Sequence, residues 1–110
     1  MATNEFEKAK VFNFAASVDY SDGGIVSKTV LKKETGNISL FSFAKGEALS
    51  EHTAPFDAMI TVVDGTGEVI IGGKSFVLTA GETIIMPANI KHAVNAVEKF
   101  KMVLTMIKSS

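Results

Sequence analysis

Short runs of apolar and β-branched residues alternate with glycine-containing turns along most of this chain. Such runs predict β-strands, because β-branched and aromatic side chains pack well on a pleated sheet. No long stretch repeats its apolar residues at the helical period. Short strands at near-even spacing predict an all-β sandwich or barrel. The predicted strands span residues 11–16, 25–31, 38–44, 59–63, 68–71, 75–78, 83–86, 90–97 and 100–107.

Three turn signals divide the second half of the chain. The link Gly72-Gly73 is of the two-residue kind that closes a tight hairpin. The segment Asp64-Gly65-Thr66-Gly67 predicts a turn that ends the strand before it. Pro87 ends the strand at 83–86, because proline donates no hydrogen bond to a ladder.

Two predicted strands, 59–63 and 100–107, carry bulky apolar side chains on both faces. A monomeric barrel with one wet face would show cleaner alternation of apolar and polar residues. We therefore predict a homodimer that buries one sheet face, to which an N-terminal strand at 11–16 would contribute.

Length and charge exclude several classes of protein. A chain of 110 residues fits a single domain, 1–110, in which the polar residues 1–10 form a short helix or a loose arm. The formal net charge of −1, with lysine as the sole basic residue type apart from histidine, argues against nucleic-acid and membrane partners. Without cysteine there is no disulfide, zinc–thiolate site or thiol nucleophile. No apolar stretch has the length of a membrane span or of a signal-peptide core, so we expect a cytoplasmic protein.

The first segment with candidate chemistry, 46–65, has the sequence GEALSEHTAPFDAMITVVDG. It resembles the first motif of the cupin superfamily, in which a glycine is followed after five residues by His-x-His, then by a glutamate and a closing glycine. Gly46, His52 and Gly65 occupy the matching positions.

The second segment, 81–95, has the sequence GETIIMPANIKHAVN and resembles the second cupin motif. Gly81, Pro87 and His92 match that motif. Asn89 replaces its glycine, and Asn95 falls one position short of its asparagine. The resemblance implies a cupin-like jelly-roll β-barrel, similar to the small single-domain bacterial cupins.

In complete cupins the two motifs hold a divalent metal through three histidines and a glutamate. By spacing, Ala54 stands for the second histidine of the first motif and Ala58 for the glutamate. Two imidazoles alone make a weak metal site, because water or a bound ligand must fill the other positions. Asp57 would complete a set of two histidines and one carboxylate if a bulge turned it inward.

Strand alternation gives the predicted pocket. Residues 50, 52 and 54 share a strand face, and residues 58, 60 and 62 should face the same interior, where His92 joins them. Core packing is the alternative role for the aromatic and methionine side chains. The predicted pocket residues are His52, His92, Ala54, Ala58, Phe43, Ile60, Met102 and Met106.

Three functions stay open on this sequence. The first is a small-molecule-binding cupin whose mostly apolar pocket is anchored by His52 and His92, with weak or absent metal binding. The second is a metal-dependent oxygenase or isomerase that holds zinc, iron, manganese or nickel with these histidines and with or without Asp57. The third is a structural or protein-interaction module. The sequence does not decide whether the protein is an enzyme.

Overall fold

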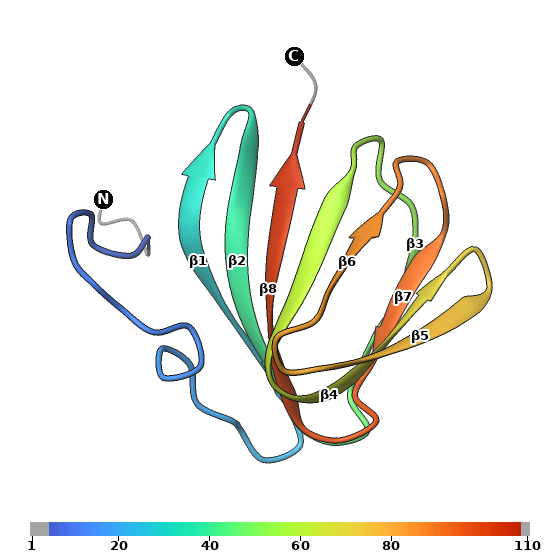
Figure 1. Ribbon diagram of the computed structural model, residues 1–110, viewed down its shortest axis with the longest axis horizontal. Helices are drawn as coiled ribbons and strands as arrows, with labels where there is room; N and C mark the ends of the chain where they lie inside the picture. Colours follow the sequence, from blue (N-terminus) through green and yellow to red (C-terminus); the bar gives the residue numbers. More distant parts are fainter. Residues whose placement is uncertain (1–4, 109–110) are drawn as a thin grey trace.

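Eight strands and no helix make up the part of the chain that the structure, a computed structural model, describes, residues 5–108. The prediction of an all-β jelly-roll barrel is confirmed (Figure 1). The strands are β1 (Ile25–Lys33), β2 (Gly36–Phe43), β3 (Ala48–His52), β4 (Ala58–Ile71), β5 (Lys74–Thr79), β6 (Thr83–Met86), β7 (His92–Asn95) and β8 (Phe100–Ile107). None of these residues lies in a helix that could cross a membrane.

The strands pair antiparallel in the order β1-β2-β8-β4-β7-β3, and β5 and β6 also pair with β4. The first half of β4 lies between β8 and β6, whereas its second half lies between β5 and β7. One strand therefore belongs to both walls of the barrel. In Figure 1 the two walls meet near the bend of β4 and diverge toward the opposite end.

The prediction that a turn at 64–67 ends the strand is wrong, because β4 bends there and continues to Ile71. The pairing of β4 with β8 shifts register between Val62 and Asp64, which is the signature of a bulge. Gly65 has a φ of 77°, and a Cβ there would lie 2.1 Å from the carbonyl oxygen of Lys99. Glycine is thus required for close contact with the neighbouring backbone, and the strand continues through it instead of ending.

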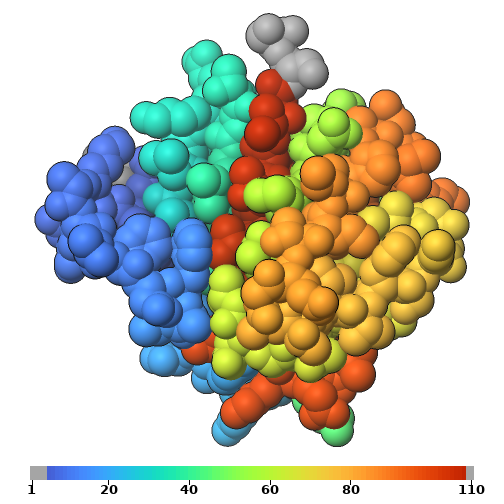
Figure 2. Space-filling model, in the orientation of Figure 1, coloured from blue at the N-terminus to red at the C-terminus, as the bar shows by residue number. Residues whose placement is uncertain are grey.

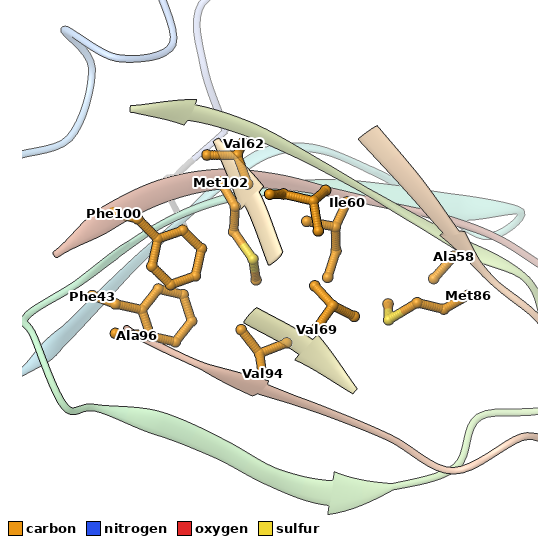
Figure 3. Close-up of a cluster of buried hydrophobic side chains, with 11 residues drawn as sticks. Phe43, Ala58, Ile60, Val62, Val69, Met86, Val94, Ala96, Phe100 and Met102 are labelled. Atoms are coloured by element: carbon orange, nitrogen blue, oxygen red, sulfur yellow. The ribbon is translucent and has the colours of Figure 1, made fainter. Parts of the chain in front are cut away.

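Apolar side chains fill the space between the two walls (Figure 3). The rings of Phe43 and Phe100 stack with centroids 4.6 Å apart at the end where the walls meet. Ile60 and Met102 are fully buried beside them. This inner core comprises Phe43, Ala58, Ile60, Val62, Val69, Leu78, Met86, Val94, Ala96, Phe100 and Met102.

The first wall is formed by β1, β2, β8, the first half of β4 and β6. A second core lies on its outer face, beneath the N-terminal segment. Val18, which is 1 % exposed, packs there with Val30, Leu40 and Val103. The segment is held to the sheet by the Ser42 hydroxyl, which donates to the carbonyl of Asp19 at 2.8 Å. The Tyr20 hydroxyl donates to Asp64, and burial, reinforced by that carboxylate, raises the pKa of the phenol.

The predicted strand at 11–16 is wrong. Asn13 organises a local turn instead, because its side-chain oxygen accepts the N–H of Ala16 and its carbonyl accepts the Ser17 hydroxyl. Asparagine side chains compete with sheet ladders in this way. The segment therefore covers part of the apolar outer face without joining the sheet, so the same chain supplies part of the cover that we expected from a second subunit. The homodimer stays a prediction.

Candidate functional site

The two histidines lie opposite each other on neighbouring strands, β3 and β7. Pairing runs from Ala48 opposite Asn95 to Leu49 opposite Val94, and then shifts register so that His52 lies opposite His92. Residues directly opposite in an antiparallel pair point to the same face. The register shift therefore brings both imidazoles to one face, which His92 shares with the buried Val94.

The imidazoles are in direct contact. Their Nε2 atoms are 3.1 Å apart, and the ring centroids lie 4.4 Å apart at an interplanar angle of 71°. His92 is 6 % exposed, whereas His52 is exposed. Burial lowers the pKa of His92, and the nearby charge of a protonated His52 lowers this pKa further. Protonation of both rings at once is therefore disfavoured.

Backbone carbonyls hold the other ring nitrogens. Nδ1 of His52 lies 2.8 Å from the carbonyl oxygen of Ser50, and Nδ1 of His92 lies 3.3 Å from that of Ile90. A carbonyl only accepts, so these contacts favour a proton on each Nδ1 and a lone pair on each Nε2. Two such lone pairs at 3.1 Å repel each other unless they share a proton or a cation, or unless His92 gives up its longer contact and donates through Nε2.

Ala58 lies at the diverging end of the inner face. It is 5 % exposed and lies opposite Met106 on β8 and Met86 on β6. Figure 3 shows Ala58 and Met86 together, at the far end from the phenylalanine stack. Ala54 lies in the loop after β3, and its carbonyl accepts the N–H of Asn89 at 2.7 Å. This bond ties the two motif segments together.

The other predicted pocket residues occupy different depths. Phe43, Ile60 and Met102 are completely buried within the inner core. Met106 is half-buried and packs against that core. Phe43, Ile60 and Met102 therefore form the floor beneath Ala58, whereas Met106 is partly open to solvent.

The carboxylate predicted to join the histidines has a structural partner. Asp57 is exposed, and its Oδ1 accepts the N–H of Ala88 at 2.8 Å, which links the start of β4 to the loop after β6. Within residues 5–108 no three histidine, cysteine, aspartate or glutamate side chains cluster closely enough to hold a metal.

Asn95 also has a defined contact. It donates to Glu68 at 3.0 Å, and the hydrogen bonds from Ser75 and then Asn95 lower the pKa of that glutamate. Asn95 therefore bonds across β7 and β4. Asn89 has a φ of 64° in the turn before β7, a backbone conformation that asparagine tolerates better than most residues.

Asn37 is a candidate that the sequence did not reveal. It lies on β2 opposite Met106, on the inner face by alternation with Phe41 and Phe43. Its side-chain oxygen is buried and has no hydrogen-bond partner within the described part of the chain. A buried, unpaired acceptor costs about 1–3 kcal/mol, so it calls for a donor. The sequence places Asn37 in a turn signal, and only the register shows that it faces inward.

Comparison with known proteins agrees with this fold. The family described as cupin domain matches residues 39–108. A conserved protein of unknown function from Streptococcus pyogenes superimposes with a TM-score of 0.92 at 35 % identity, over 100 % of this chain and 97 % of that one. A cupin superfamily protein from Desulfitobacterium hafniense shares the fold with a TM-score of 0.88 at 22 % identity, over 97 % of each chain. A comparison with curated proteins found no match.

A third similar structure is longer than this chain. A cupin 2 conserved barrel domain protein from Leptotrichia buccalis is 47 % identical with a TM-score of 0.86, and the match covers 88 % of this chain but 47 % of that one. Thus the chain spans about half the length of that relative. The family match over 39–108 includes both motif segments, 46–65 and 81–95. The Streptococcus pyogenes protein is similar over the whole chain at 35 % identity. The protein is a member of the cupin family.

Proposed function

We propose that this cupin binds a small organic molecule at the diverging end of its barrel, with His52 and His92 as polar anchors and with weak or absent metal binding. The observation that carries the proposal is the imidazole pair, whose Nε2 atoms lie 3.1 Å apart on the same face as the inner core. The ring nitrogens of such a pair can donate a hydrogen bond to a bound group or accept one from it.

The surroundings of the pair favour an organic ligand over a fully coordinated metal. At the positions of the two missing ligands the chain carries the methyl groups of Ala54 and Ala58. The half-buried Met106 offers apolar surface beside the buried Ala58, and Asn37 on the same wall has a buried oxygen that lacks a donor. Ligand sites commonly combine apolar walls with a few polar groups of this kind.

A thermal-shift screen of a diverse small-molecule library tests this function. A ligand at 100 times its Kd should stabilise the native state by about 2.7 kcal/mol, equivalent to roughly 10–20 °C in Tm for a domain of this size. The shift should disappear in His52→Ala and persist in Glu51→Ala, which alters the neighbouring exposed residue. A shift that is equal in both variants, or no shift with any compound, refutes the proposal.

The imidazole geometry also supports a second candidate, a metal-dependent enzyme. Metal-bound histidines usually donate the other ring N–H to a carbonyl or carboxylate, as both Nδ1 atoms are placed to do. His52 and His92 therefore fit as two ligands, and water or substrate would complete the set. A divalent metal held there would supply Lewis-acid chemistry. The carbonyl oxygens of Ser50 and Ile90 would hold the two imidazoles in the orientation that such a metal needs.

Metal analysis separates the two candidates. Protein purified without a histidine tag is analysed for zinc, iron, manganese and nickel, beside His52→Ala. Stoichiometric metal that is lost in the variant supports the enzyme and contradicts weak or absent metal binding. Substoichiometric metal with no thermal shift from any of these ions contradicts the enzyme.

A further inference from the structure

Two methionines flank Ala58 on the inner face of the first wall. Met106 on β8 lies opposite Ala58 on β4, and Ala58 lies opposite Met86 on β6. Residues that lie opposite each other in antiparallel strands point to the same face. In Figure 2 the end of β8 (red), the start of β4 (lime) and β6 (orange) follow one another across the upper part of the visible face. The diverging end of the barrel therefore carries two thioethers with a single methyl group between them.

The other wall brings the imidazoles to the same end. Val69 on β4 pairs with Val94 on β7, and two residues further along the same ladder Ile71 pairs with His92. Two residues along a strand correspond to about 7 Å. Met86 belongs to the same buried cluster as Val69, and Figure 3 shows its side chain extending beside Val69 on the side away from the phenylalanine stack. The sulfur end of Met86 and the imidazole of His92 therefore enter the same part of the space between the walls.

The imidazole pair can hold one ion without moving. Two ring nitrogens that each lie about 2.0 Å from one metal ion are 3.1 Å apart when the angle between their bonds is about 100°, close to the angle of a tetrahedral site. Both Nδ1 atoms lie near backbone carbonyls, which leaves the Nε2 lone pairs of His52 and His92 for the ion. An ion at this point also removes the repulsion between the two lone pairs.

The chemistry around the pair selects a soft ion of low charge. Asp57 is held by the N–H of Ala88, and within residues 5–108 no third histidine, cysteine, aspartate or glutamate side chain joins the pair. Neutral imidazoles and thioethers supply no negative charge, and the cost of taking an ion out of water rises with the square of its charge. Thioethers select copper(I) over hard divalent ions. Copper(I) and its redox-inactive analogue silver(I) therefore fit this ligand set better than zinc, iron, manganese or nickel.

We propose that the histidine pair and the thioether of Met86 bind copper(I), with Met106 as a fourth ligand. The methionine side chain has three rotatable bonds, so its sulfur adapts its position to an ion. Ala58 places only a methyl group between the two sulfurs. This site goes beyond the proposed function, because the four metals considered there are divalent and an organic ligand anchored by the histidines does not need the sulfur of Met86.

Anaerobic titration with the coloured copper(I) complex of bicinchoninate tests the site. The wild type should take one equivalent of copper(I) from this complex. His52→Ala should weaken copper(I) binding at least about 100-fold, because losing a group that only orients a metal ligand already costs about 10–100-fold. Met86→Leu keeps the size of the side chain but removes its sulfur, so copper(I) affinity should fall about tenfold or more while any zinc affinity stays unchanged.

The matched control is Met102→Leu, the same substitution at a fully buried methionine of the same core. It should leave the copper(I) affinity unchanged, because Met102 lies deeper in the barrel, beside the phenylalanine stack. Circular dichroism checks that all three variants fold.

Nuclear magnetic resonance of labelled methionine methyl groups locates the ion. The chain has five methionines, and each leucine variant assigns one methyl signal. One equivalent of silver(I) should shift the signals of Met86 and Met106 and leave that of Met102 in place. Zinc bound as tightly as copper(I), equal copper(I) affinity in Met86→Leu and Met102→Leu, or an unmoved Met86 signal would overturn the proposal. None of these results bears on the thermal-shift screen for an organic ligand.

Discussion

Restoring the two missing ligands should convert the histidine pair into a tight metal site. The perturbation is the double substitution Ala54→His with Ala58→Glu, which returns the first motif to the cupin pattern. His52 and His92 already meet with their Nε2 atoms 3.1 Å apart, so half of the ligand set is preorganised.

The expected magnitude follows from the burial of Ala58. This residue is 5 % exposed between Met106 and Met86, and inserting a larger side chain into such a site costs about 1–3 kcal/mol. At roughly 4–8 °C per kcal/mol, a cost of about 2 kcal/mol lowers the Tm of the metal-free variant by about 8–16 °C. Metal at 100 times its Kd returns about 2.7 kcal/mol, so the loaded variant should melt at or above the wild-type temperature.

Differential scanning fluorimetry with and without a chelator measures both effects. The control carries the same two substitutions together with His52→Ala, which removes one of the original imidazoles. If the double variant shows no metal-dependent Tm, or if the control shows the same dependence, then Ala54 and Ala58 do not occupy the ligand positions that their spacing implies.

Three further predictions concern stability. Val18→Ala removes two buried methyl groups and should lower the free energy of unfolding, measured by urea denaturation, by about 2 kcal/mol. Val11→Ala, at a residue that is 97 % exposed, should change this free energy by less than about 0.5 kcal/mol. Equal effects of the two substitutions would contradict the outer core. The folded state lowers the pKa of His92, so near the usual histidine pKa of about 6.5 the unfolded chain binds more protons than the folded chain. The Tm should therefore fall as the pH drops through that region. If the Tm of His92→Gln depends on pH in the same way as that of the wild type, the prediction is contradicted. Gly67→Ala places a Cβ 2.6 Å from a ring carbon of Phe100 and should cost about 1–3 kcal/mol by chemical denaturation, and a neutral result would mean that the stacked ring moves freely.

Glycine and proline residues in the sequence predicted where several strands end, because the effect of these residues is local. The hairpin at Gly72-Gly73 formed as expected, because both glycines adopt positive φ angles of 56° and 84°. The strand at 83–86 ends at the residue before Pro87, as predicted. The continuation of β4 through Gly65 was not predictable in this way, because the cause is a distant backbone, that of Lys99.

The N-terminal segment shows a different limit. An apolar run predicts that some of its side chains are buried, but it does not predict the backbone conformation of the segment or which of its residues are buried. Phe14 packs against the outer core and Val11 is almost fully exposed, although they belong to the same run. The turn around Asn13 decides between them through side-chain hydrogen bonds that strand periodicity does not represent.

The candidate site was predictable in part. The motif spacing identified His52 and His92, and the structure places them in contact. The register shift between Leu49 and His52 has no signature in the sequence, although it decides which residues face His92. Asn37 was equally hidden, because its buried oxygen depends on pairing with a strand some seventy residues away.

The central place of β8 has a consequence for biosynthesis. This strand follows the others along the chain, yet it lies between β2 and β4 and pairs with both. While a ribosome is still making residues before Phe100, β2 and β4 each present an open edge that only β8 can close. Open edges of this kind recruit strands from other chains. Ribosome stalling or premature termination before β8 should therefore yield aggregating chains rather than a partly folded barrel.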